Sequence, residues 1–151
     1  MGQSWTRVRN ATRNNMLAER AEVASGVWKL MVGLIPYRRL EPGQGMVLPH
    51  TLFFAGRGAS IHTTFMRFQI DVLFLNRTGR VIGAIHRVRP YRIVWAPGRT
   101  HDVVELPAGI LEETGCQEGD MVVLEGAVER ARTGSRAPDP TPDLPPPGVR
   151  R

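Results

Sequence analysis

One carboxylate in this chain stands out because of its neighbours. Asp71 is the only acidic residue between positions 42 and 101, and it lies within the apolar run from Ile70 to Leu75. A carboxylate among core-forming residues has to be hydrogen-bonded or paired with a cation, because burial otherwise raises its pKa. Two roles are open for Asp71: a ligand anchor or general base, and a structural group that accepts backbone N–H donors. We favour the structural role.

Other polar side chains in strand-like segments define a candidate ligand pocket with Asp71. His62, Thr64 and Met66 share one face if the strand that holds them is regular. Glu105 alternates with Val104 and Leu106, and we expect a structural ion pair between Glu105 and Arg67 or another arginine. The predicted pocket residues are His62, Thr64, Arg67, Asp71 and Glu105, with Trp95 at the rim. This set predicts a binding or accessory domain for an unknown small ligand or protein, with no residue assigned to catalysis.

Two alternatives use other chemistry. A hydrolase or isomerase would use Asp71 with His62 as acid and base, which requires both side chains in one open cleft. A single-stranded nucleic-acid-contacting protein would use the Arg-rich stretch 77–99, because arginines bind phosphates and aromatic rings stack on bases. The residues of this second alternative are Arg77, Arg80, Arg87, Arg89, Tyr91, Arg92 and Arg99. The competing interpretation is a solvated basic face, with Tyr91 and Trp95 half-buried in a strand and His62 in a core hydrogen bond.

Charge is sharply segregated along the chain. The net charge of +6 divides into +4 for residues 1–41, +7 for 42–101, −8 for 102–129 and +3 for 130–151. A basic balance is typical of nucleic-acid or membrane-surface partners. Nineteen of the twenty basic residues are arginine, however, and the acidic and basic stretches can neutralise each other if they lie side by side in the fold.

Several function classes are disfavoured by what the chain contains. Its single Cys116 rules out an internal disulfide and is expected to be a buried, unreactive thiol. The four histidines lack common metal-ligand spacings, and no nucleophile-elbow motif is present, so we expect no metal and no cofactor. The most apolar segment, 27–35, contains Lys29 and is too short to span a bilayer. We therefore expect a basic, cytoplasmic, monomeric protein without a membrane partner.

Short strands separated by Gly and Pro turns predict a mainly β (α+β) fold, namely a small β-barrel-like domain of antiparallel strands with one or two helices. Expected strands cover residues 17–23, 46–54, 66–75, 81–85, 91–95, 102–106 and 121–124. Expected helices cover 27–35 and 110–114, and Asn76–Gly79 is a hairpin turn. We predict one β-rich domain over residues 1–129 and a disordered Pro/Arg-rich tail over 130–151, which holds six of the twelve prolines.

A series of short motifs resembles a known family. In order, the motifs are Gly33-Leu34, Gly45-Met46, the segment 62–68, Ile70-Asp71-Val72-Leu73-Phe74-Leu75, Gly79-Arg80-Val81, the segment 105–109 and Gly119-Asp120. Their order and spacing over residues 10–126 are similar to those of the uncharacterised prokaryotic family catalogued as domain of unknown function 192. The chain departs from that pattern at Gln69, where the family usually has Pro, and at His62, where many members have Trp. The resemblance implies a compact β-barrel-like domain and no known activity.

Overall fold

The structure is a computed structural model that describes residues 4–25, 29, 32–49 and 60–126. Strands dominate this part of the chain, and the helix α2 (Ile110–Thr114) is a short element inside the fold. The strands are β1 (Ser4–Asn10), β2 (Asn15–Val23), β3 (Gln44–Pro49), β4 (Ser60–His62), β5 (Ile70–Leu75), β6 (Val81–Val88), β7 (Ile93–Trp95), β8 (Asp102–Pro107) and β9 (Val122–Gly126).

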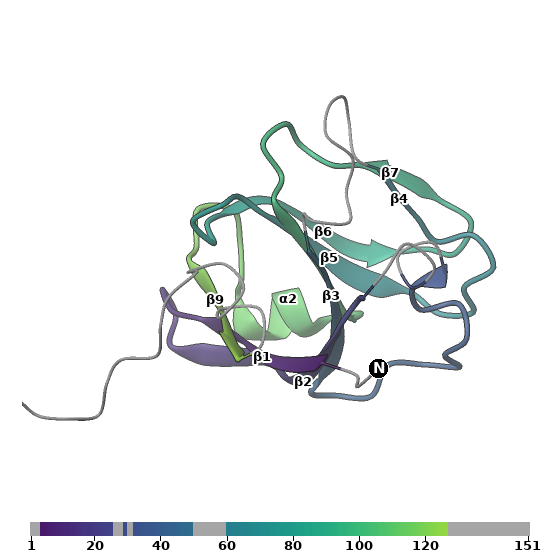
Figure 1. Cartoon of the computed structure of the whole chain (residues 1–151), viewed down its shortest axis with the longest axis horizontal. Helices are drawn as coiled ribbons and strands as arrows, with labels where there is room; N and C mark the ends of the chain where they lie inside the picture. Colours follow the sequence, from purple (N-terminus) through teal and green to yellow (C-terminus); the bar gives the residue numbers. More distant parts are fainter. Residues whose placement is uncertain (1–3, 26–28, 30–31, 50–59, 127–151) are drawn as a thin grey trace, which may run out of the picture.

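Seven strands form one curled sheet in the order β6-β5-β8-β3-β2-β1-β9, and α2 lies within the curl (Figure 1). The two end strands approach each other at one end, where Val122 N–H donates to Gly79 O and Val81 N–H donates to Asp120 O. The predicted β-barrel-like fold is thus confirmed as a half-barrel pinched together at one end. One pair differs from the prediction of antiparallel strands, because β2 and β3 run parallel.

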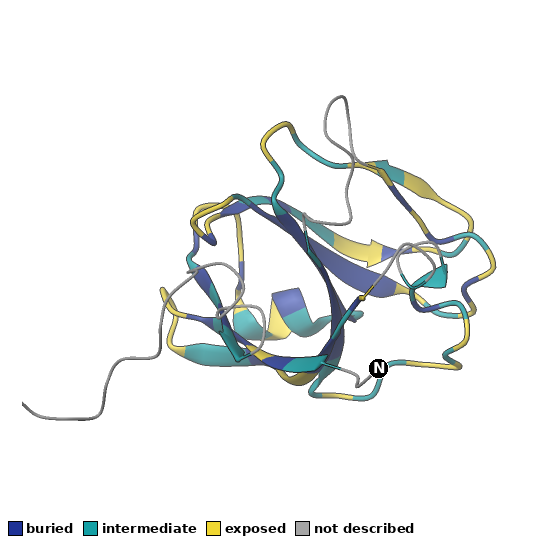
Figure 2. Ribbon diagram, viewed as in Figure 1, coloured by how far each residue is buried: buried dark blue, intermediate teal, exposed yellow. Residues whose placement is uncertain are grey.

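Both faces of the main sheet are covered, because the central strands are apolar on both sides. The inner face carries Leu73, Val104 and Leu106, and Leu111 of α2 packs there. The outer face carries Met46, Val72, Phe74 and Val103, and a second sheet of two strands, β4 and β7, packs over it through Ile61 and Val94. Figure 2 shows the contrast between the buried central strand β5 and the more exposed β7.

The sequence pattern located several elements correctly. The helix of residues 110–114 and the hairpin turn at 76–79 are confirmed, and Gly79 takes the positive φ of 91° that the turn requires. Other expectations were wrong. β1 was not predicted, and the strand expected from Met66 begins only at Ile70, because residues 66–69 are irregular with a bend at Phe68. His62, Thr64 and Met66 do not share a strand face, since β4 ends at His62 and Thr64 lies in a turn, and the strand expected over 91–95 begins only at Ile93.

Some predictions fall partly or wholly outside the described residues. Within the predicted helix 27–35, the described Lys29 and Val32 are helical and a turn follows them, while residues 26–28 and 30–31 are outside. The end of the predicted strand 46–54 and the tail 130–151 also lie outside. In the part of the chain that is described, no helix is both long and apolar enough to cross a membrane.

Candidate functional site

Asp71 is held in a cradle of backbone donors. Its side chain has no exposed surface, and Oδ1 accepts the N–H of Arg87 at 2.8 Å. Oδ2 accepts the N–H groups of Gly109 and Leu111, both at 2.9 Å. Two of the three donors, Arg87 and Gly109, have positive φ angles of 51° and 98°. The carboxylate therefore ties β5 to the end of β6 and to the start of α2, which confirms the structural role favoured from sequence.

Glu105 lies on the opposite face of the sheet from Asp71. In the register of β5 and β8, Asp71 is opposite Leu106, which packs on the inner face, whereas Glu105 is opposite Val72, which packs on the outer face. Cross-strand partners point to the same side of a sheet. The two carboxylates thus do not converge, and they do not line one common pocket.

Glu105 is a buried acid with an unsatisfied oxygen. The residue is 5% exposed, and its Oε2 has no hydrogen-bond partner among the described residues. The predicted ion pair with Arg67 was wrong, because Arg67 is exposed and no ion pair of Glu105 is found in the described part of the chain. Burial raises the pKa of Glu105 to about 7, since the charged form has lost its water without gaining a partner.

A second buried acid shows what Glu105 lacks. The registers of β2, β3 and β8 place Glu22, Met46 and Glu105 in one row across the outer face. Glu22 accepts a hydrogen bond from the Tyr37 hydroxyl and forms an ion pair with Lys29 at 3.1 Å. Burial and the neighbouring Glu22 raise the pKa of Tyr37 to about 12. Among the described residues, Glu22 therefore has both a cation and a hydroxyl donor, while Glu105 has neither.

The β4–β7 sheet has one buried and one exposed face. Ile61 and Val94 point to the core, and their register places Ser60 beside Trp95 and His62 beside Ile93 on the other side. This other side is open to solvent: Ile93 is 65% exposed and Trp95 is 70% exposed. We name this surface, together with the neighbouring Phe65 and Tyr91, the ribbon face. Phe65 and Tyr91 are each 65% exposed and meet edge to face, with ring centroids 6.1 Å apart.

Thr63 fixes the loops that carry Phe65 and Tyr91. Its side chain is buried, and its hydroxyl donates to Arg89 O at 2.7 Å and accepts the Arg92 N–H at 2.9 Å. Its backbone N–H donates to Arg92 O, and its carbonyl accepts the N–H of Tyr91. One threonine thus joins the turn after β4 to the turn before β7, and sequence reasoning missed it because nothing in its neighbours marks a buried hydroxyl.

Both aromatic residues in these turns have a costly backbone conformation. Phe65 has φ of 66° and Tyr91 has φ of 59°, in the left-handed region that bulky residues rarely adopt. Strain of this kind persists only where surrounding contacts hold it, and it is concentrated at functional sites. Here the Thr63 hydrogen bonds supply those contacts, and the outcome is two rings held in water rather than packed in the core.

The basic residues divide into neutralised and free groups. Arg9, Arg13 and Arg87 pair with Glu125, Asp120 and Glu112 at 2.7, 2.6 and 2.9 Å. The acidic stretch therefore does lie beside part of the basic one. Four exposed arginines around the ribbon face in sequence form no ion pair within the described residues. They are Arg67, Arg89, Arg92 and Arg99.

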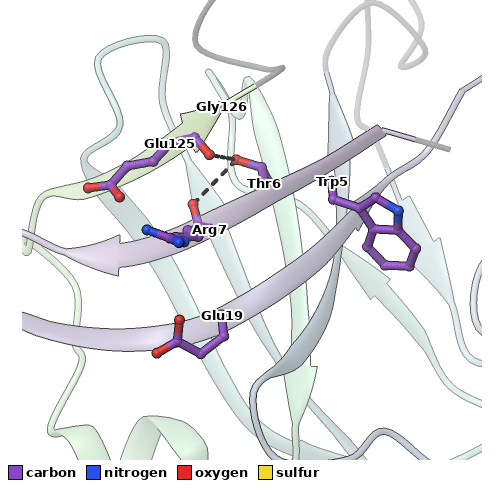
Figure 3. A pocket seen from close by; sticks show the side chains of 6 residues that line it. All are labelled: Trp5, Thr6, Arg7, Glu19, Glu125 and Gly126. Atoms are coloured by element: carbon purple, nitrogen blue, oxygen red, sulfur yellow. Dashed lines mark hydrogen bonds between the residues drawn. The ribbon is translucent and has the colours of Figure 1, made fainter. Parts of the chain in front are cut away.

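A surface hollow of about 330 Å³ lies elsewhere, at the edge formed by β1, β2 and β9 (Figure 3). Trp5, Arg7, Glu19 and Glu125 line it, with Thr6 donating a hydrogen bond to Glu125 O. Arg20 lies over the Trp5 ring at 4.0 Å from its centroid. None of the residues predicted for the ligand pocket lines this hollow, and it is open to solvent rather than enclosed.

The predicted pocket residues are therefore distributed over three places. His62 and Trp95 lie on the ribbon face, and the exposed position of both corrects the expectation that they are buried or half-buried, as does the exposure of Tyr91. Thr64 and Arg67 lie in the segment between β4 and β5. Asp71 and Glu105 are buried on opposite faces of the main sheet. Because Asp71 is fully buried and His62 is exposed, these two do not share an open cleft; the role of each residue in binding stays a prediction.

The predicted arginine set is likewise separated. Arg77 and Arg80 lie at the β5–β6 hairpin, where the Arg80 guanidinium donates to Gly119 O. Arg87 is in the ion pair with Glu112, and only Arg89, Arg92 and Arg99 belong to the segments adjoining β7. Cys116 is buried as expected, and burial raises the pKa of its thiol to about 11.

Two proteins named UPF0127 are similar to this chain in sequence. The UPF0127 protein of Thermococcus sibiricus is 28% identical over 122 residues, which cover 81% of this chain and 77% of that protein. A UPF0127 protein of Pyrococcus horikoshii is 36% identical over 64 residues, which cover 42% of this chain and 55% of that protein.

Two crystal structures share the fold. A "putative transcription regulator" from Sinorhizobium meliloti 1021 has a TM-score of 0.69 at 21% identity, covering 82% of this chain and 94% of that one. A protein of unknown function from Novosphingobium aromaticivorans DSM 12444 has a TM-score of 0.68 at 22% identity, and the match covers 79% of this chain and 83% of that one. The model of the domain-of-unknown-function family DUF192, described as "Uncharacterized ACR", matches residues 8–124. Since this match spans most of the half-barrel and agrees with the motif order seen in the sequence, the chain belongs to the DUF192 family.

Proposed function

We propose that this protein is a binding domain that contacts single-stranded nucleic acid through the ribbon face. The observation that carries the proposal is the exposure of four large apolar side chains, Phe65, Tyr91, Ile93 and Trp95, on one small sheet and its adjoining turns. Single exposed apolar residues are ordinary, whereas two adjoining pairs, Phe65 with Tyr91 and Ile93 with Trp95, support an interaction surface. The strained backbone of Phe65 and Tyr91 supports the same interpretation, since the fold holds these rings outward at a cost.

The chemistry of the surface favours nucleic acid as the partner. Three of the four side chains are aromatic, and aromatic rings stack on bases without regard to sequence. Arg89 and Arg92 flank Tyr91, and both anchor the Thr63 hydroxyl through their backbone groups, which keeps them within the same turn. Asp71, the single acid among residues 60–101, is fully buried. The exposed charges near the ribbon face in sequence, within residues 60–101, are therefore positive, as contact with phosphates requires.

The alternatives have less support. A pocket around Asp71 would need a free carboxylate oxygen, yet both oxygens of Asp71 are occupied by backbone donors. Acid–base chemistry by Asp71 and His62 would need a common cleft. The description of the Sinorhizobium meliloti structure as a transcription regulator applies to that protein, and at 21% identity its likeness carries the fold alone.

The test is fluorescence anisotropy with a labelled 15-nucleotide poly-U or poly-dT strand. We expect binding at 50 mM salt that weakens about 16-fold at 200 mM, because about three phosphate contacts give a slope near −2 for a single strand. Trp95→Ala should weaken binding about tenfold or more through the loss of one stacking partner. Its thermal unfolding should be unchanged, since the indole is exposed.

A matched pair of double variants separates a site from general basicity. Arg89→Ala/Arg92→Ala and Arg7→Ala/Arg80→Ala each remove two exposed positive charges, but only the first pair adjoins the ribbon face. The first variant should bind several-fold more weakly than the second and show a smaller salt dependence. Absence of binding at 50 mM salt, equal weakening by the two variants, or a Trp95→Ala protein that binds like the wild type would overturn the proposal.

A further inference from the structure

The ribbon face also has the chemistry of a surface that binds proline-rich peptides. Such surfaces present exposed aromatic rings, against which the flat faces of proline pack. Phe65, Tyr91 and Trp95 supply the rings, and Arg89 and Arg92 make the surroundings positive. An acidic proline-rich segment therefore complements this surface both in shape and in charge.

The chain itself contains such a segment, at residues 137–149, outside the described residues. It has six prolines, two aspartates (Asp139 and Asp143) and no basic residue, although Arg136 precedes it and Arg150 follows it. We propose that this segment of the same chain docks on the ribbon face and competes there with nucleic acid. The competition rests on the proposed function, whereas the docking does not.

The length of the intervening chain permits the contact. Residues 127–136 separate the end of β9 from the segment, and ten extended residues reach about 33 Å. A domain of about 125 residues has a radius of gyration of roughly 14 Å, so half of its circumference is on the order of 55 Å. The linker alone does not span that distance, but the 20 residues from 127 to Pro146 reach about 66 Å when extended. A tether of this kind gives a local concentration on the order of 1 mM. The same chain is therefore favoured over a second copy as the source of the segment at micromolar protein concentrations.

The expected effect on nucleic-acid binding is modest. Proline-rich segments lose little conformational freedom on docking, because their extended helix is largely preformed. With a local concentration of about 1 mM and an intrinsic dissociation constant of about 0.3 mM, the ribbon face is free roughly a quarter of the time. Substitution of the aspartates or the prolines of this segment should then strengthen nucleic-acid binding about fourfold.

The test uses the full chain with substitutions in the segment. The indole N–H cross-peak of Trp95 in a ¹H–¹⁵N spectrum, assigned with Trp95→Phe, reports on the ribbon face directly. Asp139→Asn/Asp143→Asn removes the negative charges, and Pro145→Ala/Pro146→Ala removes prolines. Thr133→Ala/Ser135→Ala changes the same part of the chain outside the segment and serves as control.

We expect the Trp95 cross-peak to move in both segment variants and to stay in place in the control, with nucleic-acid affinity raised about fourfold in the segment variants alone. An unmoved cross-peak in the segment variants overturns the docking. A shift that grows with protein concentration assigns the segment to a second copy and overturns docking within one chain. A shifted cross-peak in a protein that binds no nucleic acid at 50 mM salt leaves the docking intact and refutes the proposed function and its competition.

Discussion

Glu105 makes the stability of this protein depend on pH in a way that one substitution should remove. The carboxyl group is buried in the outer-face apolar cluster, and Oε2 has no partner among the described residues. Burial raises the pKa of Glu105 from 4.5 to about 7, so the folded state holds its proton over a range in which the unfolded chain has released it. The unfolded state is therefore favoured progressively as the pH rises from about 4.5 to about 7.

The magnitude follows from the two pKa values. Each unit of difference corresponds to about 1.4 kcal/mol, so the full effect above pH 7 is about 3 kcal/mol of lost stability. Below pH 4.5 both states are protonated and the loss disappears. Between pH 5 and pH 8 the change from this group alone is about 2 to 3 kcal/mol. That is a large share of the total stability of a domain of this size.

The assay is urea unfolding of the wild type and Glu105→Gln at pH 5, 6, 7 and 8. The glutamine side chain brings amide donors into the same apolar surroundings, which adds a cost that does not depend on pH. The quantity to compare is therefore how the stability difference between variant and wild type changes from pH 5 to pH 8. This change should favour the variant by about 2 to 3 kcal/mol, or about 1 to 2 M urea in midpoint. Other titrating groups are common to both proteins and cancel.

Glu113→Gln is the control, because Glu113 is an exposed acid on α2. Surface substitutions of this kind change stability by less than about 0.5 kcal/mol, so its difference from wild type should remain small across the range. If Glu105→Gln and the wild type differ by the same amount at pH 5 and pH 8, Glu105 is not held neutral by burial and the reasoning fails.

Three further substitutions test the structural contacts. Asp71→Asn should lower the unfolding free energy by about 3 kcal/mol or more, because an amide cannot accept three backbone N–H donors as the carboxylate does; a loss below about 1 kcal/mol in urea unfolding would show that the cradle is not formed. Thr63→Val should cost about 1 to 3 kcal/mol by calorimetry and should change the near-ultraviolet circular dichroism of the ribbon-face aromatics; an unaltered spectrum would separate Thr63 from their positioning. Gly79→Ala should destabilise the protein strongly, since its Cβ would lie 2.4 Å from Val122 O at a φ of 91°, whereas Gly98→Ala has open space and should change the melting temperature little; equal effects would contradict the pinched end of the half-barrel.

Local patterns predicted those elements whose own residues decide them. The helix 110–114 begins after a Pro-Ala-Gly break and ends at a glycine, and the hairpin has Gly79 at the one position that needs positive φ. For Asp71, the sequence favoured a structural acceptor of backbone N–H groups, which its three donors confirm, whereas its place in a ligand pocket stays a prediction. β1 was missed because its seven residues carry few apolar side chains and depend on pairing with β2 and β9 on either side.

Non-local contacts decided what the sequence pattern could not. The even positions from Met66 to Phe74 are all apolar, yet the strand begins only at Ile70. Before it the chain turns at Phe65, where no glycine or asparagine marks a positive φ. That turn is held by the Thr63 hydrogen bonds to residues almost thirty positions later in the chain. For the same reason, the register that separates Asp71 from Glu105 is visible only once β5 and β8 are paired.

The two sheets of this protein differ in how they use the faces that point away from the interior of the half-barrel. The main sheet buries both faces. Among its buried acids, Asp71 is held by backbone donors and Glu22 by Tyr37 and Lys29, while one oxygen of Glu105 has no partner among the described residues. The β4–β7 sheet adds little area to the core, since only Ile61 and Val94 face inward from it. If this sheet served only to cover the core, the protein would be more stable with polar residues at its solvent-exposed positions and with negative φ angles at Phe65 and Tyr91. Instead, large apolar side chains occupy the outer positions and a buried threonine holds the strained turns. Selection on stability alone does not favour that combination, whereas selection on binding does.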